Sequence, residues 1–213
     1  MIFRLDERLI FPDPFQAEED GLLAVGGDLS VNRLLLAYRQ GIFPWYGNDT
    51  PILWYAPKQR FVLYPAGLKV SKSMRRTMRS GRFNITTNRC FAEVIQNCSS
   101  SFRKDQEGTW ITGDMITAYI DLHRMGYAHS VEIWEHNLLV GGLYGVQVGR
   151  VFCGESMFSK VNNASKAALI HLCLYGGYDL VDCQVYTDHL ASMGARMIDT
   201  HIYLQQLQQQ SAQ

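Results

Sequence analysis

The sequence lacks several features that would define its class at once. It has no run of the roughly 18 apolar residues that a membrane span needs, and its N-terminus, MIFRLDERLIFPDPF, has early acids and no apolar signal-peptide stretch. Its five cysteines are odd in number and no two are spaced as CxxC, which argues against a disulfide framework and a structural zinc site. The motifs GxGxxG, HExxH and GxSxG are also missing. We therefore expect a cytoplasmic protein with reduced thiols, no metal and no cofactor.

Net charge is missing as well, because 20 Lys and Arg balance 20 Asp and Glu. The sum hides a segregation of charge. Residues 58–89 contain nine Lys and Arg and no acid, so this segment carries +9 and the rest of the chain −9. Lys72, Arg75, Arg76 and Arg79 recur on one side of a helix predicted over 71–79. A solvated face is the plain alternative, but unrelieved repulsion favours a phosphate backbone as partner.

The pattern of turns and periodic segments predicts two domains and an α+β fold. Residues 41–57 hold three prolines and five aromatics, which is typical of an ordered loop region. We place a boundary near residue 60, between a small N-terminal domain (1–60) and a larger one (61–213). The larger one is expected to have a mixed sheet, built from a strand at 60–64, a meander over 130–156 and a β-rich stretch at 180–186. Helices are expected at 31–40, 71–79, 91–98, 164–174 and 188–193, another from Thr112 or Asp114 to Gly126, and a frayed polar tail over 205–213.

Two tryptophans stand beside loop-forming residues. Trp45 follows Pro44, and Trp110 lies close to Gly108. Exposed loop aromatics suit stacking on an unpaired base, which is worth roughly 1–3 kcal/mol each. They can equally cover the small N-terminal domain, and the residues alone leave both readings open.

Three polar side chains stand in segments that are otherwise apolar. Glu155 ends a strand in FCGESMFS (152–159), so it must be paired or have a raised pKa. In LVDCQVY (180–186), strand alternation places Asp182 and Gln184 on one face. A structural ion pair for Glu155 and a hydrogen-bonded edge strand for the other two are the plain alternatives.

Several stretches together resemble the leucyl/phenylalanyl-tRNA–protein transferase family. They run in the family's order from about residue 10 to 204 and are GLLAVGGDLS (21–30), YRQGIFPW (38–45), ILWYAP (52–57), EGTWIT (107–112), HSVEIW (129–134), GGLYGV (141–146), FCGESMFS (152–159), NASKAAL (163–169) and DCQV (182–185). The resemblance implies a small N-terminal domain on a GNAT-like acyltransferase domain. It also implies transfer of Leu or Phe, less readily Met, from aminoacyl-tRNA to proteins that begin with Arg or Lys, which creates an N-degron.

The resemblance also implies roles for particular residues. Glu155, Asp182 and Gln184 would form the reacting centre, and Trp45 and Trp110 would stack on the terminal adenosine of the tRNA. The aminoacyl side chain would enter an apolar pocket made by Tyr38, Leu143, Phe152, Met157, Leu169, Leu172 and Val181. Leu143 and Leu172 replace a methionine and a phenylalanine familiar in the family, so the pocket keeps its polarity and changes its shape. Lys72, Arg75, Arg76 and Arg79 would bind tRNA phosphates.

Two other functions compete with this one. The strand and helix order after residue 128 would also suit an acetyl-CoA-dependent N-acetyltransferase, but SMFSKVNNAS (156–165) is not a pyrophosphate-binding loop. A tRNA-binding module without catalysis would need only the basic helix. With no net charge and no heptads, we expect a monomer with no membrane partner.

Overall fold

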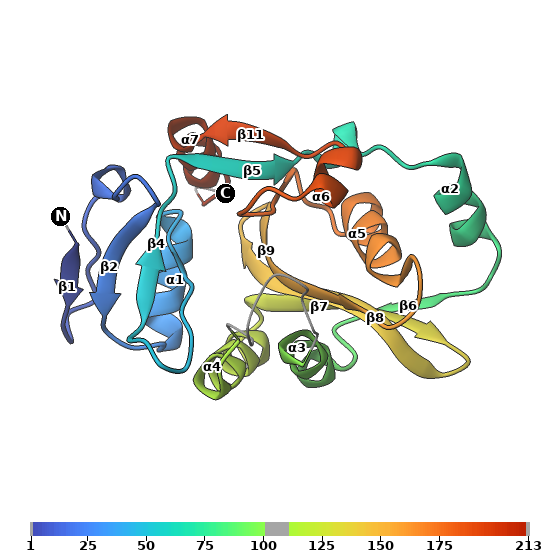
Figure 1. Ribbon diagram of the computed structural model, residues 1–213, viewed down its shortest axis with the longest axis horizontal. Helices are drawn as coiled ribbons and strands as arrows, with labels where there is room; N and C mark the ends of the chain where they lie inside the picture. The colour runs from blue at the N-terminus through green and yellow to red at the C-terminus, as the bar shows by residue number, and fades with distance from the viewer. Residues whose placement is uncertain (1, 101–110, 212–213) are drawn as a thin grey trace.

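The computed structural model describes residues 2–100 and 111–211, and these form two β-sheets with helices around them (Figure 1). A four-stranded sheet has the order β1-β2-β4-β3, and a seven-stranded mixed sheet has the order β11-β5-β10-β9-β8-β7-β6. The strands are β1 (Phe3–Leu5), β2 (Leu22–Gly26), β3 (Phe43–Pro44), β4 (Leu53–Tyr55), β5 (Gln59–Leu63), β6 (Asn84–Thr87), β7 (Ala128–Glu135), β8 (Leu138–Val148), β9 (Val151–Ser159), β10 (Leu180–Asp182) and β11 (Arg196–Asp199). The helices are α1 (Val31–Arg39), α2 (Lys72–Arg79), α3 (Phe91–Ser99), α4 (Gly113–Arg124), α5 (Ala164–Tyr175), α6 (Asp188–Ser192) and α7 (Thr200–Ser211), with 3₁₀ turns η1 (Pro14–Gln16) and η2 (Pro65–Gly67). The predicted α+β class with a mixed sheet is confirmed.

The helix starts follow from short polar side chains that cap the first turn. The Ser30 hydroxyl accepts from the Arg33 amide at the start of α1, and Ser71 and Thr112 do the same for α2 and α4. Such caps satisfy amide groups that have no partner inside the helix. The predictions of these three helices are confirmed.

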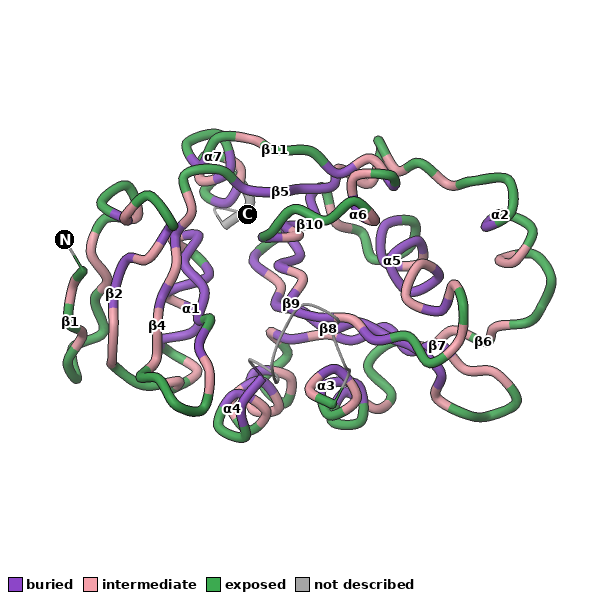
Figure 2. Tube along the Cα trace, viewed as in Figure 1, coloured by how far each residue is buried: buried purple, intermediate pink, exposed green. Residues whose placement is uncertain are grey.

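The larger sheet is built around the predicted meander. Strands β7, β8 and β9 are antiparallel neighbours, while β10 runs parallel to β9. Helices α3 and α4 cover one face of the sheet and α5 covers the other (Figure 1), and α5 is buried along much of its length (Figure 2). Gly145 is required in β8, because a Cβ there would collide with the Cys153 carbonyl oxygen of β9. A register shift between Tyr144 and Gly145 lies at the same place.

The N-terminal region is more regular than predicted. Residues 41–57 were expected to be loops, but β3 and β4 within them join β1 and β2 in the small sheet. Trp54 is completely buried there and donates its indole N–H to the Gly26 carbonyl at 2.8 Å. Strands this short carry too little alternation for a sequence pattern to reveal them.

Two expectations about the C-terminal region are wrong. The strand predicted over 180–186 ends at Asp182, and Gln184 has a positive φ of 61°. The tail expected to fray continues as α7 to Ser211, after strand β11, which was not predicted. Tyr203 and Leu207 of this helix are buried against the rest of the protein, so tertiary packing stabilises the helix. Among residues 2–100 and 111–211, no helix combines the length and apolarity that crossing a membrane requires.

Candidate active site

An apolar pocket of about 510 Å³ lies between the larger sheet, α5 and the segment that carries Trp45. Six residues predicted for an aminoacyl pocket line it: Leu143, Phe152, Met157, Leu169, Leu172 and Val181. They come from β8, β9, α5 and β10, which converge because β10 runs beside β9 and α5 connects the two. Residues that are far apart in the sequence therefore form one concave surface.

Tyr38, the seventh residue predicted for the pocket, is absent from its lining. It is buried on α1, and its hydroxyl is hydrogen-bonded to the hydroxyl of Tyr119 on α4. Tyr119 in turn donates to Glu155 Oε2 at 3.2 Å. Tyr38 therefore reaches the site through a chain of hydroxyl groups.

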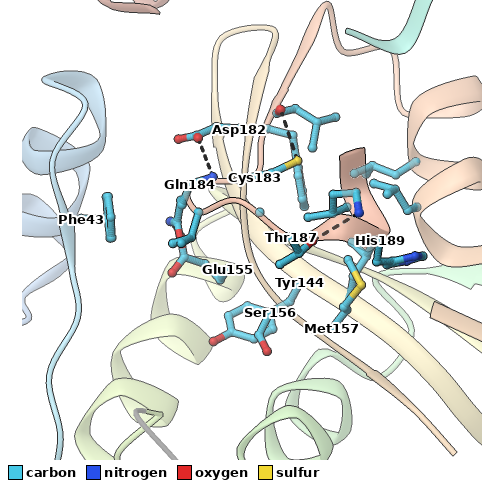
Figure 3. A pocket seen from close by; sticks show the side chains of 18 of the residues that line it. Phe43, Tyr144, Glu155, Ser156, Met157, Asp182, Cys183, Gln184, Thr187 and His189 are labelled. Atoms are coloured by element: carbon cyan, nitrogen blue, oxygen red, sulfur yellow. Dashed lines mark hydrogen bonds between the residues drawn. The ribbon is translucent and has the colours of Figure 1, made fainter. Parts of the chain in front are cut away.

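Glu155 lines the pocket and is 6% exposed. Its Oε1 accepts from Nε2 of Gln184 at 2.8 Å, and Figure 3 shows Gln184 between Glu155 and Asp182. Burial raises the pKa of Glu155 to about 7, against hydrogen bonds from tyrosine and Gln184 that lower it. The carboxyl group can therefore exchange a proton near neutral pH.

Asp182 is fully buried and has three sets of donors. The Arg60 guanidinium forms a salt bridge with it, the Tyr203 hydroxyl donates to Oδ2 at 2.8 Å, and the Gln184 backbone N–H donates to Oδ1 at 2.9 Å. We expected strand alternation to bring Asp182 and Gln184 to one face. Instead the strand ends, and the carboxylate holds the backbone amide of Gln184.

Arg60, like Tyr119 and Tyr203, is a residue of this centre that the sequence did not reveal. It was counted with the basic segment, but it is 1% exposed and donates Nη1 to the Gly41 carbonyl at 3.0 Å. Its guanidinium lies 4.7 Å from the ring centres of both Phe43 and Tyr203. A basic residue directly before the apolar run FVL was a signal, since a charge in a buried strand needs a partner.

The two tryptophans have different outcomes. Trp45 lines the pocket beside Phe43 and Pro44, is 37% exposed, and packs edge-on against Tyr55 with ring centres 5.7 Å apart. Trp110 lies outside the described residues.

The four basic residues predicted on one face of α2 do lie together. Lys72, Arg75, Arg76 and Arg79 are exposed and, with Ser80, line a shallow hollow, while Met74 on the other side is buried. Two other basic residues of 58–89 are paired with acids of this chain: Arg60 is buried against Asp182, and Arg82 forms an ion pair with Glu135 at 2.6 Å. Within the described ranges, no three His, Cys, Asp or Glu side chains are grouped so that they could hold a metal ion.

The fold and the site together define an α+β protein in which a mixed sheet encloses an apolar pocket beside a buried carboxyl–amide pair. Family models for leucyl/phenylalanyl-tRNA protein transferase match residues 62–208, and the model for the N-terminal domain of that family matches residues 27–58. The chain belongs to this family, which confirms the resemblance found in its sequence.

Curated relatives agree with this assignment. The leucyl/phenylalanyl-tRNA–protein transferase of Syntrophobacter fumaroxidans is 59% identical over 206 residues, covering 95% of this chain and 88% of that protein. The one of Flavobacterium johnsoniae is 52% identical, covering 95% of this chain and 97% of that protein. Solved structures are more distant: FemX is 9% identical with a TM-score of 0.49, covering 79% of this chain and 66% of that one. A GCN5-related N-acetyltransferase from Kribbella flavida has a TM-score of 0.38, with 9% identity and coverage of 76% and 58%.

Proposed function

We propose that this protein transfers leucine or phenylalanine, and less readily methionine, from aminoacyl-tRNA to the α-amino group of proteins that begin with Arg or Lys. The new N-terminal residue would mark the acceptor for degradation as an N-degron. The observation that carries the proposal is the apolar pocket with Glu155 and Gln184 in its wall, in a chain of this family.

The pocket supports an apolar aliphatic or aromatic side chain as its occupant. Its volume of about 510 Å³ exceeds what one such side chain fills, so the ester carbonyl and part of the terminal ribose can enter the same cavity. An apolar wall discriminates by only about 1–3 kcal/mol per methylene, which fits acceptance of Leu, Phe and Met. An acidic side chain would lose its hydration and meet the carboxyl groups of Glu155 and Asp182 instead of a cationic partner.

The tRNA would be held at two places. Trp45, which lines the pocket, and Trp110 would stack on the terminal adenosine. Lys72, Arg75, Arg76 and Arg79 would bind backbone phosphates, which gives affinity without sequence readout.

The reaction is aminolysis of an ester, so it needs a neutral amine held against the carbonyl carbon. Nε2 of Gln184 donates to Glu155, and the Gln184 carbonyl would therefore be turned to accept from the attacking amine. Glu155, with its pKa raised to about 7, would take the proton that the amine loses. As the new C–N bond forms, the ester C–O bond breaks and the proton passes to the leaving ribose oxygen. Asp182 would act by holding Gln184.

A transfer assay tests this directly. Purified protein is mixed with [14C]Leu-tRNA and peptides that begin with Arg, Lys or Ala. We expect label in the Arg and Lys peptides, little in the Ala peptide, and none with Gln184→Ala. Absence of transfer with intact tRNA binding would indicate a binding module, and tight coenzyme A binding by calorimetry would indicate an N-acetyltransferase.

We also propose a domain division, an oligomeric state and a cellular location, each from fewer observations. A division into domains at 1–60 and 61–213 is supported by the separate family matches to 27–58 and 62–208. A cytoplasmic location is supported by the five free cysteines, and a monomer by the zero net charge and the lack of heptads in the sequence. Analytical ultracentrifugation tests the monomer, and a dimer at micromolar concentration would contradict it.

A further inference from the structure

The buried Arg60 and the buried Tyr203 both contact Asp182, and neither lines the pocket. We propose that Arg60 and Tyr203 are positioning residues for the transfer reaction, acting through Asp182 on the side chain of Gln184. This inference rests on the proposed function for its kinetic consequence, and on the geometry alone for its structural one.

The first step concerns the backbone of Gln184. Its φ of 61° lies in the left-handed region, which a residue with a Cβ adopts only where its surroundings impose it. The Gln184 amide donates to Asp182 Oδ1 at 2.9 Å, and the Gln184 carbonyl accepts from the Phe61 amide at 3.5 Å, so both sides of this backbone are held. With this backbone, the side chain turns back to reach Glu155 at 2.8 Å. The carboxylate of Asp182 therefore sets the direction of the Gln184 amide group.

The second step concerns Asp182 itself. A carboxylate at 0% exposure keeps one orientation only if each oxygen has a fixed donor. The two oxygens face the planar fork of Arg60, and Oδ2 also accepts from Tyr203. The Arg60 fork is itself fixed by the Gly41 carbonyl and by the rings of Phe43 and Tyr203. The donors around the carboxylate therefore come from different parts of the chain: Arg60 from β5, Tyr203 from α7, and the Gln184 amide from the segment after β10.

The third step concerns the segments of the chain that Arg60 brings together. Gly41 and Phe43 lie four and two residues before Trp45, and Tyr203 belongs to α7. Arg60 thus connects the segment that carries Trp45, the C-terminal helix and the reacting centre through one side chain. A shift of any of them would reach Gln184 through Asp182.

The chain offers matched controls for the two positions. Arg33 is buried to the same degree, and its guanidinium binds Asp28 and the Asp6 carbonyl in the small sheet region, away from the pocket lining. Tyr64 is bonded through its hydroxyl to Gln206 of α7, so it tethers the same helix without touching Asp182. Loss of a buried guanidinium or of an α7 tether can therefore be separated from loss of Asp182 positioning.

The kinetic test compares Arg60→Lys and Tyr203→Phe with Arg33→Lys and Tyr64→Phe. We expect both Arg60→Lys and Tyr203→Phe to lower kcat at least about tenfold. In Tyr203→Phe the KM for Leu-tRNA stays within about twofold, because Arg60 still holds the segment that carries Trp45 and only alignment is lost. The two controls keep kcat within about twofold. If Tyr203→Phe retains wild-type kcat, or if its effect is confined to KM, the inference is overturned, whether or not Arg60→Lys folds.

A second measurement is independent of activity. Amide hydrogen exchange of Gln184, followed by NMR, should be slow in the wild type and at least about tenfold faster in Tyr203→Phe, with the amides of β8 and β9 unchanged. Equal exchange in both proteins overturns the inference even if the wild type transfers leucine. If the wild type transfers nothing, the proposed function fails, and the exchange of this amide still decides whether Tyr203 and Asp182 position Gln184.

Discussion

The carboxyl of Glu155 is the group whose titration links stability to activity. The sequence predicted that it must be paired or have a raised pKa, and the structure shows both: hydrogen bonds from Gln184 and Tyr119, and a pKa raised by burial to about 7. A carboxyl whose pKa is raised on folding favours the folded state below its unfolded value near 4.5, and this contribution is lost as pH rises through 7.

Glu155→Gln should therefore flatten the pH dependence of stability. Between pH 5 and pH 8 the free energy of unfolding of the wild type should fall by about 2 kcal/mol more than that of the variant, from a shift of this size at 1.36 kcal/mol per pKa unit. Urea unfolding at the two pH values measures this difference. Parallel pH profiles for the two proteins would contradict the raised pKa, and Glu93→Gln, at an exposed position of α3, serves as the control.

Leu172 and Leu143 decide the shape of the pocket, since both line it and both replace bulkier or longer residues familiar in the family. Leu172 is 4% exposed on α5. Leu172→Phe would fill part of the cavity and should lower kcat/KM for Phe-tRNA relative to Leu-tRNA about tenfold, because overpacking costs about 1–3 kcal/mol. Transfer assays with both tRNAs measure the ratio. Leu174→Phe, on the exposed side of the same helix, should leave the ratio unchanged, and an equal change in both variants would exclude a pocket effect.

The residues that sequence reasoning missed share one property: their function depends on partners distant in the chain. Arg60 and Asp182 are 122 positions apart, and neither segment alone reveals that β5 and β10 are neighbours. Tyr38 was placed in the pocket by its position in a motif, yet its hydroxyl is bonded to that of Tyr119 and the residue is not part of the pocket lining. Composition shows which charges exist, and only the sheet order shows which of them meet.

Helix α7 is the element that local sequence predicts worst. Its residues after 204 are mostly glutamine, which carries no strong apolar period, so the tail was expected to fray. The capped helices and the meander were predictable because caps and turns act over a few residues. Helix α7 instead depends on the packing of its own Tyr203 and Leu207 against the rest of the protein, and both residues are 0% exposed. Strand β11 pairs only with β5, more than 130 residues earlier, and was equally invisible.

Leu207→Ala should accordingly destabilise the whole protein although it lies close to the C-terminus. Removing a fully buried leucine side chain costs about 2–5 kcal/mol. Gln208→Ala, at the exposed neighbouring position, should change stability by less than about 0.5 kcal/mol. Thermal or urea unfolding compares them. A change below about 1 kcal/mol for Leu207→Ala would mean that α7 contributes little to the folded core.

The net charge of the whole molecule is zero, but its basic residues are concentrated in one part of the surface. Helix α2 lies at one end of the long axis and the smaller sheet at the other, with α5, β8 and β9 between them (Figure 1). Exposed basic residues line α2, while the pocket is lined from β8, β9, β10 and α5. A nucleic acid that reaches both would contact the basic face through phosphates and the pocket through its aminoacylated end. These two contacts differ in physical character, because the first releases counterions and the second buries apolar surface.

The two contacts should therefore separate when tested with ligands of different size. In Arg75→Gln/Arg76→Gln/Arg79→Gln, the Kd for Leu-tRNA should rise, and the slope of log K against log salt should become shallower by about 3, since about one counterion is released per phosphate contact. Phenylalanyl-adenosine, which can fill the pocket but carries no phosphate, should inhibit the wild type and this variant with the same constant and with little dependence on salt. Arg150→Gln, whose guanidinium is paired with Asp179, should leave the salt slope of Leu-tRNA binding unchanged. Equal weakening of both ligands by the triple substitution would mean that α2 acts on the shape of the pocket, and an unchanged salt slope would remove α2 from the tRNA-binding surface.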